Sequence, residues 1–323
     1  VSSTHTHTGP PSNVKEGPAP VVAYRKLLVA GIADSIVRAH AALRPAGVGA
    51  AASAVPEEVF CRRWFLKPGK MTPNPFGQMD KVKMNPPRSP DVLDRPAGPT
   101  DPDVTILSVQ DVKSAKPLAL LANYSLHYVG HVPAEMISAD YFGEFVRLMQ
   151  SRVGDGGFVA MMSNGTSGDI NNIPFLVNRP PREPFEQIQV VAQKTAEAAW
   201  RAHATIATHC RDARLGMIER EVTLERRRPT DQQIAAAEAV LAVRDPAERD
   251  KLPRLAENYA RRTLSLAKDS ESVTVPVQAL RIGDLAVCTL PFEVFAEIGL
   301  DLKQRSPFPQ TMVISLANGT NGY

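Results

Sequence analysis

The chain has 323 residues, of which 43% are hydrophobic and 22% are charged, and its formal net charge is +3. This balance is typical of a globular protein with a buried core and excludes a disordered or fibrous chain. Basic residues are scattered among acidic ones instead of forming a stripe, which argues against nucleic acid as a partner.

The three cysteines lie far apart in the sequence, and none belongs to a Cys-x-x-Cys pair: Cys61, Cys210 and Cys288. A disulfide framework or a cysteine zinc site is therefore not expected. No apolar run reaches the roughly twenty residues of a membrane-spanning helix, and no export signal opens the chain. Because the chain lacks an initial Met and stops at Tyr323 directly after a motif, we expect a segment cut from a longer protein.

The first part of the chain is predicted to form a helix, a long loop and a β-hairpin. Apolar residues recur at helical spacing in residues 21–43, which predicts an amphipathic helix that packs on the core. Residues 66–102 are rich in Pro and Gly with few periodic apolar residues, so we expect a long surface loop. Strands at 104–109 and 118–127 follow, and the polar turn between them predicts a hairpin.

The middle of the chain alternates helices with one short strand. Residues 141–153 and 186–203 have the apolar spacing of helices, and residues 158–162 form a short apolar run typical of a buried strand. This strand runs into residues 163–172, which are rich in Asn, Gly and Ser. Such transitions from strand to loop commonly carry reactive groups.

The last part is predicted to contain a helical hairpin and a β-hairpin. Residues 214–224 alternate like a strand, and Thr230 is a suitable N-cap for helices at 231–268, whose mixed charges are typical of a solvent face. Gly283-Asp284 separates two apolar runs and is the strongest hairpin signal in the chain. The remaining elements are the two strands of this hairpin, a helix and a final strand: residues 273–282, 285–290, 293–304 and 312–316. The elements together predict a mixed α/β fold, in one domain over residues 1–323.

Two pairs of histidines are candidates for metal binding. His5 and His7 are separated by one residue, so on an extended strand their side chains would point to the same face. This arrangement suits two metal ligands, or one ligand beside a proton-transfer group. His127 and His131 flank Gly130, which argues against a continuous helix, so these two need not share one metal.

Acidic residues supply further candidates. Glu293 lies among apolar neighbours, where a carboxylate costs free energy unless it is paired or bound to a metal, although the start of a surface helix is the alternative. Asp169 is a catalytic candidate that could equally be a turn residue. The sequence contains no His-Glu-x-x-His stretch, phosphate-binding glycine loop, Gly-x-Ser-x-Gly elbow or dinucleotide fingerprint. The enzyme classes that these motifs mark are therefore less favoured.

Four segments, in the same order, resemble the neutral ceramidase family of zinc amidases. They are Thr4-His5-Thr6-His7-Thr8-Gly9-Pro10, Asn123-Tyr124-Ser125-Leu126-His127, Gly168-Asp169-Ile170-Asn171-Asn172, and Pro291-Phe292-Glu293-Val294-Phe295 with Asn318-Gly319-Thr320-Asn321-Gly322-Tyr323. The resemblance spans nearly the whole chain and implies a ceramidase-like fold of mixed sheets with flanking helices. It also implies an exported amidase that acts on a small-molecule or lipid-like N-acyl substrate, with peripheral rather than transmembrane contact to membranes.

The resemblance also implies a cofactor, Zn²⁺, and its ligands. The metal-binding positions of the family fall at His5, His127, Glu293 and Tyr323, and such a donor set leaves zinc an open position for water. In the family the second histidine of the His-Thr-His pair sits beside the metal and meets the substrate, which here is His7. An arginine that orients the substrate falls at Arg62 or Arg63, and the sequence does not choose between them.

One position departs from the family pattern. The family's Gly-Asp-Val-Ser-Pro-Asn segment supplies a serine near the scissile carbonyl, whereas Asn171 stands at that place here. An amide cannot act as a nucleophile, but it can donate a hydrogen bond to a developing oxyanion. The sequence therefore favours attack by zinc-activated water over a serine route.

The same departure weakens ceramide as the substrate and keeps two alternatives open. Residues 66–102 offer mostly Lys, Pro, Gly, Asn and Asp, which favours a more polar N-acyl compound over a long acyl chain. One alternative is a zinc hydrolase of another ester or of a sugar-linked amide. The other is a non-catalytic binding domain that retains the scaffold.

Overall fold

The computed structural model describes residues 1–11, 16–74, 76, 78–253 and 255–321. The chain divides into two compact units. The first consists of Val1–Cys61, Gly98–Glu219 and Gln278–Tyr323, and the second of Arg62–Ala97 and Arg220–Val277. The catalytic domain expected from the sequence spans both units, and that assignment stays a prediction.

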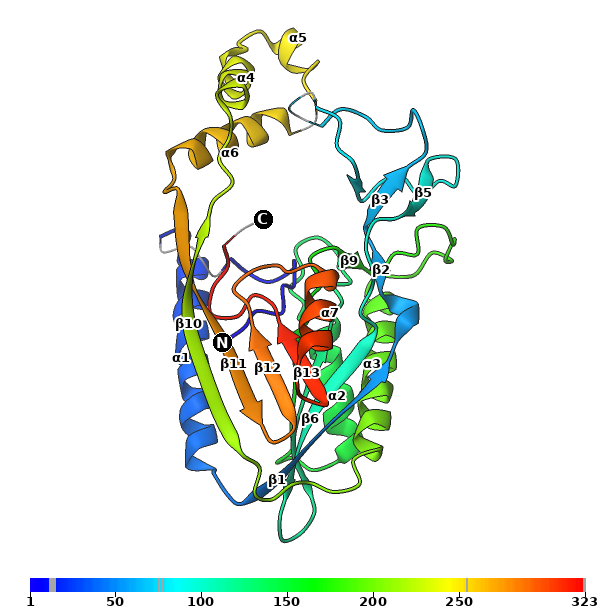
Figure 1. Ribbon diagram of the computed structural model, residues 1–323, viewed down its shortest axis with the longest axis vertical. Coiled ribbons are helices and arrows are strands. Elements are labelled where there is room, and N and C mark those ends of the chain that lie inside the picture. The colour runs from blue at the N-terminus through cyan, green and yellow to red at the C-terminus, as the bar shows by residue number, and fades with distance from the viewer. Residues whose placement is uncertain (12–15, 75, 77, 254, 322–323) are drawn as a thin grey trace. The chain divides into compact units, whose positions relative to one another are not determined.

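The first unit contains a four-stranded sheet of order β1-β6-β7-β8, of which β1 and β6 are labelled in Figure 1. Its strands are β1 Ala46–Ala54, β6 Asp103–Asp111, β7 Pro117–Tyr124 and β8 Val159–Asn164. β6 and β7 pair antiparallel, which confirms the predicted hairpin, whereas β8 runs parallel to β7. Parallel neighbours need a crossover connection, and α2 (Asp140–Val153) supplies it.

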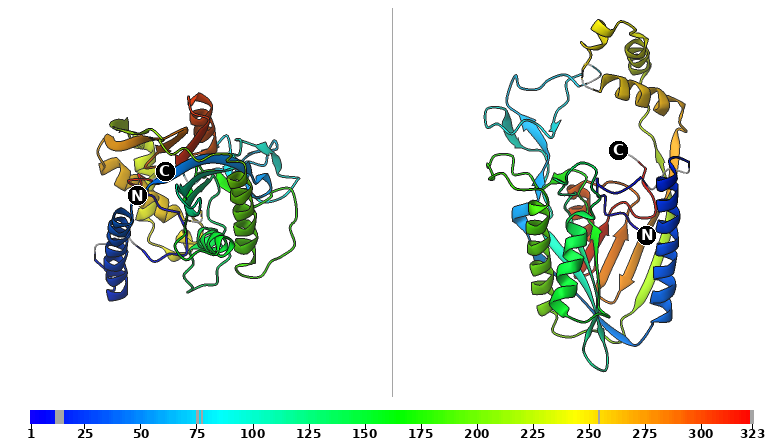
Figure 2. Two further views of the ribbon diagram at one scale, coloured as in Figure 1. Left: turned by 90° about the horizontal axis from the view of Figure 1, so that it is seen from below. Right: turned by 180° about the vertical axis from the view of Figure 1, so that it is seen from behind.

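Two helices cover one face of this sheet. α2 and α3 (Glu186–Ala204) pack against each other there (Figure 2). α3 buries a row of alanines, whose small side chains let the helix approach its neighbours closely. Large buried side chains fill the rest of this core: Ile106, Tyr124, Leu126, Tyr141, Phe145 and Met149. The core fixes the ends of β7 and β8, from which two loops of the candidate site depart.

A second sheet has the order β10-β11-β12-β13. Its strands are β10 Leu215–Glu225, β11 Ser272–Ile282, β12 Leu285–Thr289 and β13 Gln310–Ile314. Ile282 pairs with Leu285, so the predicted two-residue hairpin turn at Gly283-Asp284 is confirmed. α7 (Ala296–Arg305) connects β12 to β13, which run parallel.

The two sheets share a second, smaller core. Neighbouring residues on a strand point to opposite faces, so Ile106 faces the helices while Leu107 faces away from them. Leu107 and Leu121 of the first sheet pack against a cluster that includes Val287 and Met312 of the second. The first unit is thus layered as helices, sheet and sheet, which is the mixed α/β architecture expected from the sequence.

The second unit contains a small sheet and the helical hairpin. β3 (Arg63–Leu66) lies between β4 (Lys83–Met84) and β5 (Leu93–Pro96), so the expected surface loop at 66–102 includes two short strands. The helices are α4 Asp231–Ala242, α5 Pro246–Arg249 and α6 Ala256–Lys268. Thr230 caps α4 in a reciprocal pair with Gln233, which confirms the predicted helix start.

The long N-terminal helix was predicted correctly, but its packing was not. α1 (Ala19–Ala41) contains no buried residue, and Leu27 and Val37 are 70% and 65% exposed. The apolar residues are distributed around the helix instead of on one face, so spacing alone misjudged its burial. Among the described residues, none of the helices has both the length and the apolar character to cross a bilayer.

Candidate metal centre

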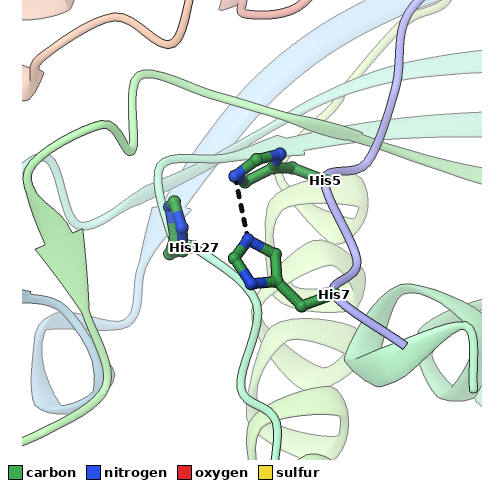
Figure 3. Close-up of side chains that lie close together, drawn as sticks. All are labelled: His5, His7 and His127. Atoms are coloured by element: carbon green, nitrogen blue, oxygen red, sulfur yellow. Dashed lines mark hydrogen bonds between the residues drawn. The ribbon is translucent and has the colours of Figure 1, made fainter. Parts of the chain in front are cut away.

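The N-terminal segment brings two imidazoles together by a turn of the backbone. The extended strand predicted at His5 and His7 is wrong, because no strand forms there and His5 has a left-handed φ of 64°. The two rings nevertheless lie with their centroids 4.7 Å apart and their Nε2 atoms 3.2 Å apart (Figure 3). The hydroxyls of Thr6 and Thr8 both donate to the carbonyl of Ser138 at 3.1 Å, which anchors the segment.

The third imidazole comes from the loop after β7. His127 is 2% exposed, and its ring centroid lies 4.7 Å from that of His5. Its Nδ1–H donates to the carbonyl of Ser167 at 3.1 Å. This bond fixes the tautomer and leaves the lone pair on Nε2, as is usual for a histidine that binds a metal through that atom.

Glu293 joins the histidines from the segment between β12 and α7. Its Oε2 lies 3.5 Å from Nε2 of His5, and its Oε1 lies 3.5 Å from Nδ1 of His127. The carboxylate is almost fully buried. The helix predicted to start at Glu293 begins three residues later, so Glu293 belongs to the loop before α7.

A second loop supports the Glu293 segment. Gly168 donates its backbone N–H to the carbonyl of Val294 at 2.8 Å, and a Cβ at this glycine would lie 2.6 Å from the carbonyl oxygen of Glu293. Asp169 is fully buried, and its carboxylate accepts the backbone N–H of Ala296 at 2.9 Å. Since Ala296 is the first residue of α7, Asp169 satisfies one of the unpaired N–H groups of the helix start. This geometry gives Asp169 a supporting function, and a catalytic one stays a prediction.

The donor atoms fit a zinc ion in both chemistry and spacing. The ligand atoms of His5, His7 and His127 all lie within 4.8 Å of one another. Zinc–nitrogen bonds of 2.0–2.1 Å in a tetrahedron place neighbouring ligand atoms about 3.3 Å apart. The 3.5 Å between Nε2 of His5 and Oε2 of Glu293 is close to that value. Nε2 of His7 lies 3.2 Å from Nε2 of His5, which is also within ligand spacing, and its place beside the metal instead of on it stays a prediction. Imidazole nitrogen and carboxylate oxygen are also the ligands that zinc accepts.

For the other predicted site residues, a place in this group stays a prediction. Tyr323 lies outside the described residues. Arg62 and Arg63 belong to the second unit, so their contact with a substrate stays a prediction. Asn171 lies in β9 (Ile170–Asn171), which pairs with β2 (Phe60–Cys61). Its side-chain oxygen accepts the backbone N–H of Ile173 at 3.0 Å, and its contact with a substrate stays a prediction.

Sequence reasoning missed two residues beside the histidines. The ring of Tyr128 stacks on that of His7, with centroids 3.8 Å apart and planes 19° apart. The Asp140 carboxylate accepts the backbone N–H groups of Val129 and Gly130, each at 2.9 Å. Burial raises the pKa of this carboxyl, although its backbone hydrogen bonds act in the opposite direction. The glycine at position 130 was the sequence signal for this loop, because the turn that these bonds stabilise has a φ of 76° there.

Solved structures with a similar fold include two ceramidases. A structure of neutral ceramidase from Pseudomonas aeruginosa has a TM-score of 0.65 and 16% identity, over 99% of this chain and 54% of that one. A ceramidase complexed with C2 has a TM-score of 0.66 and 16% identity, over 100% of this chain and 55% of that one. The chain has a neutral-ceramidase-like fold. This confirms the resemblance and the fold class expected from the sequence.

The likeness concerns the fold, and it covers part of the similar proteins. The chain spans about half of the length of the two ceramidase structures. No family model matches the sequence, and no curated protein matches it.

Proposed function

We propose that this chain is a zinc-dependent hydrolase that cleaves an amide bond of an N-acyl compound with water. The observation that carries the proposal is the convergence of His5, His127 and Glu293, with His7 beside them, in a fold like that of the neutral ceramidases. In this proposal His5, His127 and Glu293 hold the metal, with Tyr323 as a fourth ligand. A bound zinc ion would polarise the scissile carbonyl and lower the pKa of a water molecule.

The chain's own residues would handle the proton and the substrate. His7 is exposed beside buried His127, so it can reach both water and a bound substrate. It would take a proton as water adds to the carbonyl carbon and return that proton to the nitrogen as the C–N bond breaks. Asn171 would donate a hydrogen bond to the carbonyl oxygen as it gains charge. Arg62 or Arg63 would orient the substrate.

Metal removal and return test this proposal with a fluorogenic N-acyl substrate. Activity should disappear when zinc is removed by a chelator and return when zinc is added. Glu293→Ala should abolish turnover, whereas His40→Ala, which removes an exposed histidine of α1, should not. His7→Ala should retain the metal and lose turnover, because its function lies in proton transfer. Equal metal loss in His5→Ala and His7→Ala would show that this division between the two histidines is wrong.

A panel of substrates would separate the proposed activity from its alternatives. We propose a small-molecule or lipid-like N-acyl substrate, with a polar compound favoured over a long-chain ceramide. Faster turnover of esters or of sugar-linked amides would assign a different zinc hydrolase. Asn171, which replaces the family's serine, favours one further alternative, a binding domain that retains the scaffold. That alternative predicts bound metal without turnover of any member of the panel.

A further inference from the structure

The ring of Tyr128 covers one face of the His7 imidazole. The two rings are nearly parallel at 19°, and their centroids lie 3.8 Å apart, which is a close stack. Tyr128 also lies with its ring centroid 5.1 Å from that of His127. The half-buried Tyr128 ring therefore stacks on exposed His7 and lies next to buried His127.

His7 is the exposed histidine of the three, so its rotamer is the one that a stacked ring restricts most. His127 is held by burial and by its bond to Ser167, and His5 is partly buried beside Glu293. His7 is exposed, and an exposed side chain ordinarily exchanges between rotamers within nanoseconds. A stacked ring restricts that exchange and keeps Nε2 of His7 directed toward Nε2 of His5, 3.2 Å away.

The loop that carries Tyr128 is built to hold the ring in this place. The carboxylate of Asp140 accepts the N–H groups of Val129 and Gly130 at 2.9 Å and of Tyr141 at 2.7 Å. At Gly130 the backbone has a φ of 76°, and a Cβ there would lie 3.0 Å from Cε2 of Tyr128. Glycine at position 130 therefore adopts the positive φ of the turn and also leaves room for the Tyr128 ring.

We propose that Tyr128 is a positioning residue that fixes the ring of His7 at the metal centre, and that Asp140 anchors the loop that carries it. The ring placement itself is a property of the metal-free chain. Its effect on turnover rests on the proposed function, in which His7 transfers the proton. Tyr128 acts through His7 and is not itself assigned contact with the reacting atoms.

Nuclear magnetic resonance of the full, metal-free chain tests the placement without any assay of activity. Protons above an aromatic face resonate upfield, so the ring protons of His7, assigned by their loss in His7→Ala, should be shifted upfield. The shift should persist in Tyr128→Phe, which keeps the aromatic face, and disappear in Tyr128→Leu. The matched control Tyr259→Leu makes the same chemical change in α6 and should leave the His7 signals in place. Unchanged His7 signals in Tyr128→Leu would overturn the proposal.

Two further measurements keep the result interpretable. If Tyr128→Leu does not fold, the variant Asp140→Asn is measured in its place. Asparagine tolerates the left-handed φ of 54° at this position. Its NH₂ group cannot accept a hydrogen bond, so one of the two loop N–H groups loses its acceptor. That variant should broaden the His7 signals and reduce their upfield shift, and an unchanged spectrum would again overturn the proposal. In the zinc-loaded chain, Tyr128→Leu should lower kcat up to about tenfold relative to Tyr128→Phe, with KM unchanged. If the wild-type chain neither binds zinc nor turns over substrate, the proposed function fails while the spectra still decide the ring placement.

Discussion

Replacing Gly168 by alanine should weaken the protein and its metal centre together. The added Cβ would lie 2.6 Å from the carbonyl oxygen of Glu293 and 3.0 Å from that of Val294. Both contacts are with backbone atoms, which cannot rotate away as a side chain does, so the two loops must separate by several tenths of an ångström. Overpacking of this kind costs about 2 kcal/mol. The hydrogen bond from Gly168 to Val294 would weaken as well, at a further cost of about 1 kcal/mol.

The expected loss for Gly168→Ala is therefore about 3 kcal/mol in the free energy of unfolding. Zinc affinity should fall at least tenfold, because the displaced segment carries Glu293. Gly156→Ala is the matched control, since a Cβ there meets nothing within 4 Å. Urea unfolding and competition with a chromogenic chelator measure the two effects. If both glycine variants unfold and bind zinc like the wild type, the close approach of the two loops does not support the site.

Three further predictions concern other parts of the first unit. Burial lowers the pKa of His203, and burial together with the charge of His203 lowers the pKa of His209. Both folded-state pKa values therefore lie below the unfolded value near 6.5. The protein should have its full stability above pH 6.5 and lose stability as the pH falls below that value. Urea unfolding at pH 7.5 and 5.5 measures this loss, which His203→Asn with His209→Asn should reduce. Glu58→Gln should lower the free energy of unfolding by about 3 kcal/mol, because its buried carboxylate accepts hydrogen bonds from Arg179, Gln187 and Lys194. Asn171→Ala should lower kcat by up to about a hundredfold and leave metal content unchanged, as measured by steady-state kinetics and elemental analysis.

Each of these predictions has a control or an outcome that contradicts it. A loss of stability on acidification that is equally large in the double histidine variant would remove His203 and His209 as its cause. Glu57→Gln, which alters a 52% exposed neighbour of Glu58, should change stability by less than about 1 kcal/mol, and an equal effect of both variants would argue against a buried ion network. Metal loss in Asn171→Ala would place Asn171 with the ligands instead of with the substrate.

The sequence predicts many elements of both units well because their signals are local and periodic. The hairpin at Gly283-Asp284, the capped helix after Thr230 and the apolar strands β6 and β7 all follow from spacing within a few residues. Spacing does not show which face of a helix meets a partner when apolar residues surround it. For that reason the packing of α1 was misjudged although its helical structure was predicted.

The candidate site was only partly predictable, since its residues meet through long-range packing. The rings of His5 and His7 lie side by side, through a left-handed turn instead of the expected strand, and their roles at a metal stay predictions. Glu293 stood out as a carboxylate among apolar neighbours, and it does lie beside two imidazoles. Nothing local in the sequence shows that Ser167 accepts a hydrogen bond from His127 or that Tyr128 stacks on His7, because these contacts depend on where two loops meet.

Titration of the metal-free chain with zinc shows whether His5, His127 and Glu293 form a metal site. We expect one tight site per chain, with affinity reduced by at least a hundredfold in His5→Ala, His127→Ala and Glu293→Ala, because each variant removes one ligand from a small set. His40→Ala should bind zinc as tightly as the wild type. A wild-type chain without a tight zinc site, or three ligand variants that bind zinc as the wild type does, would contradict the account.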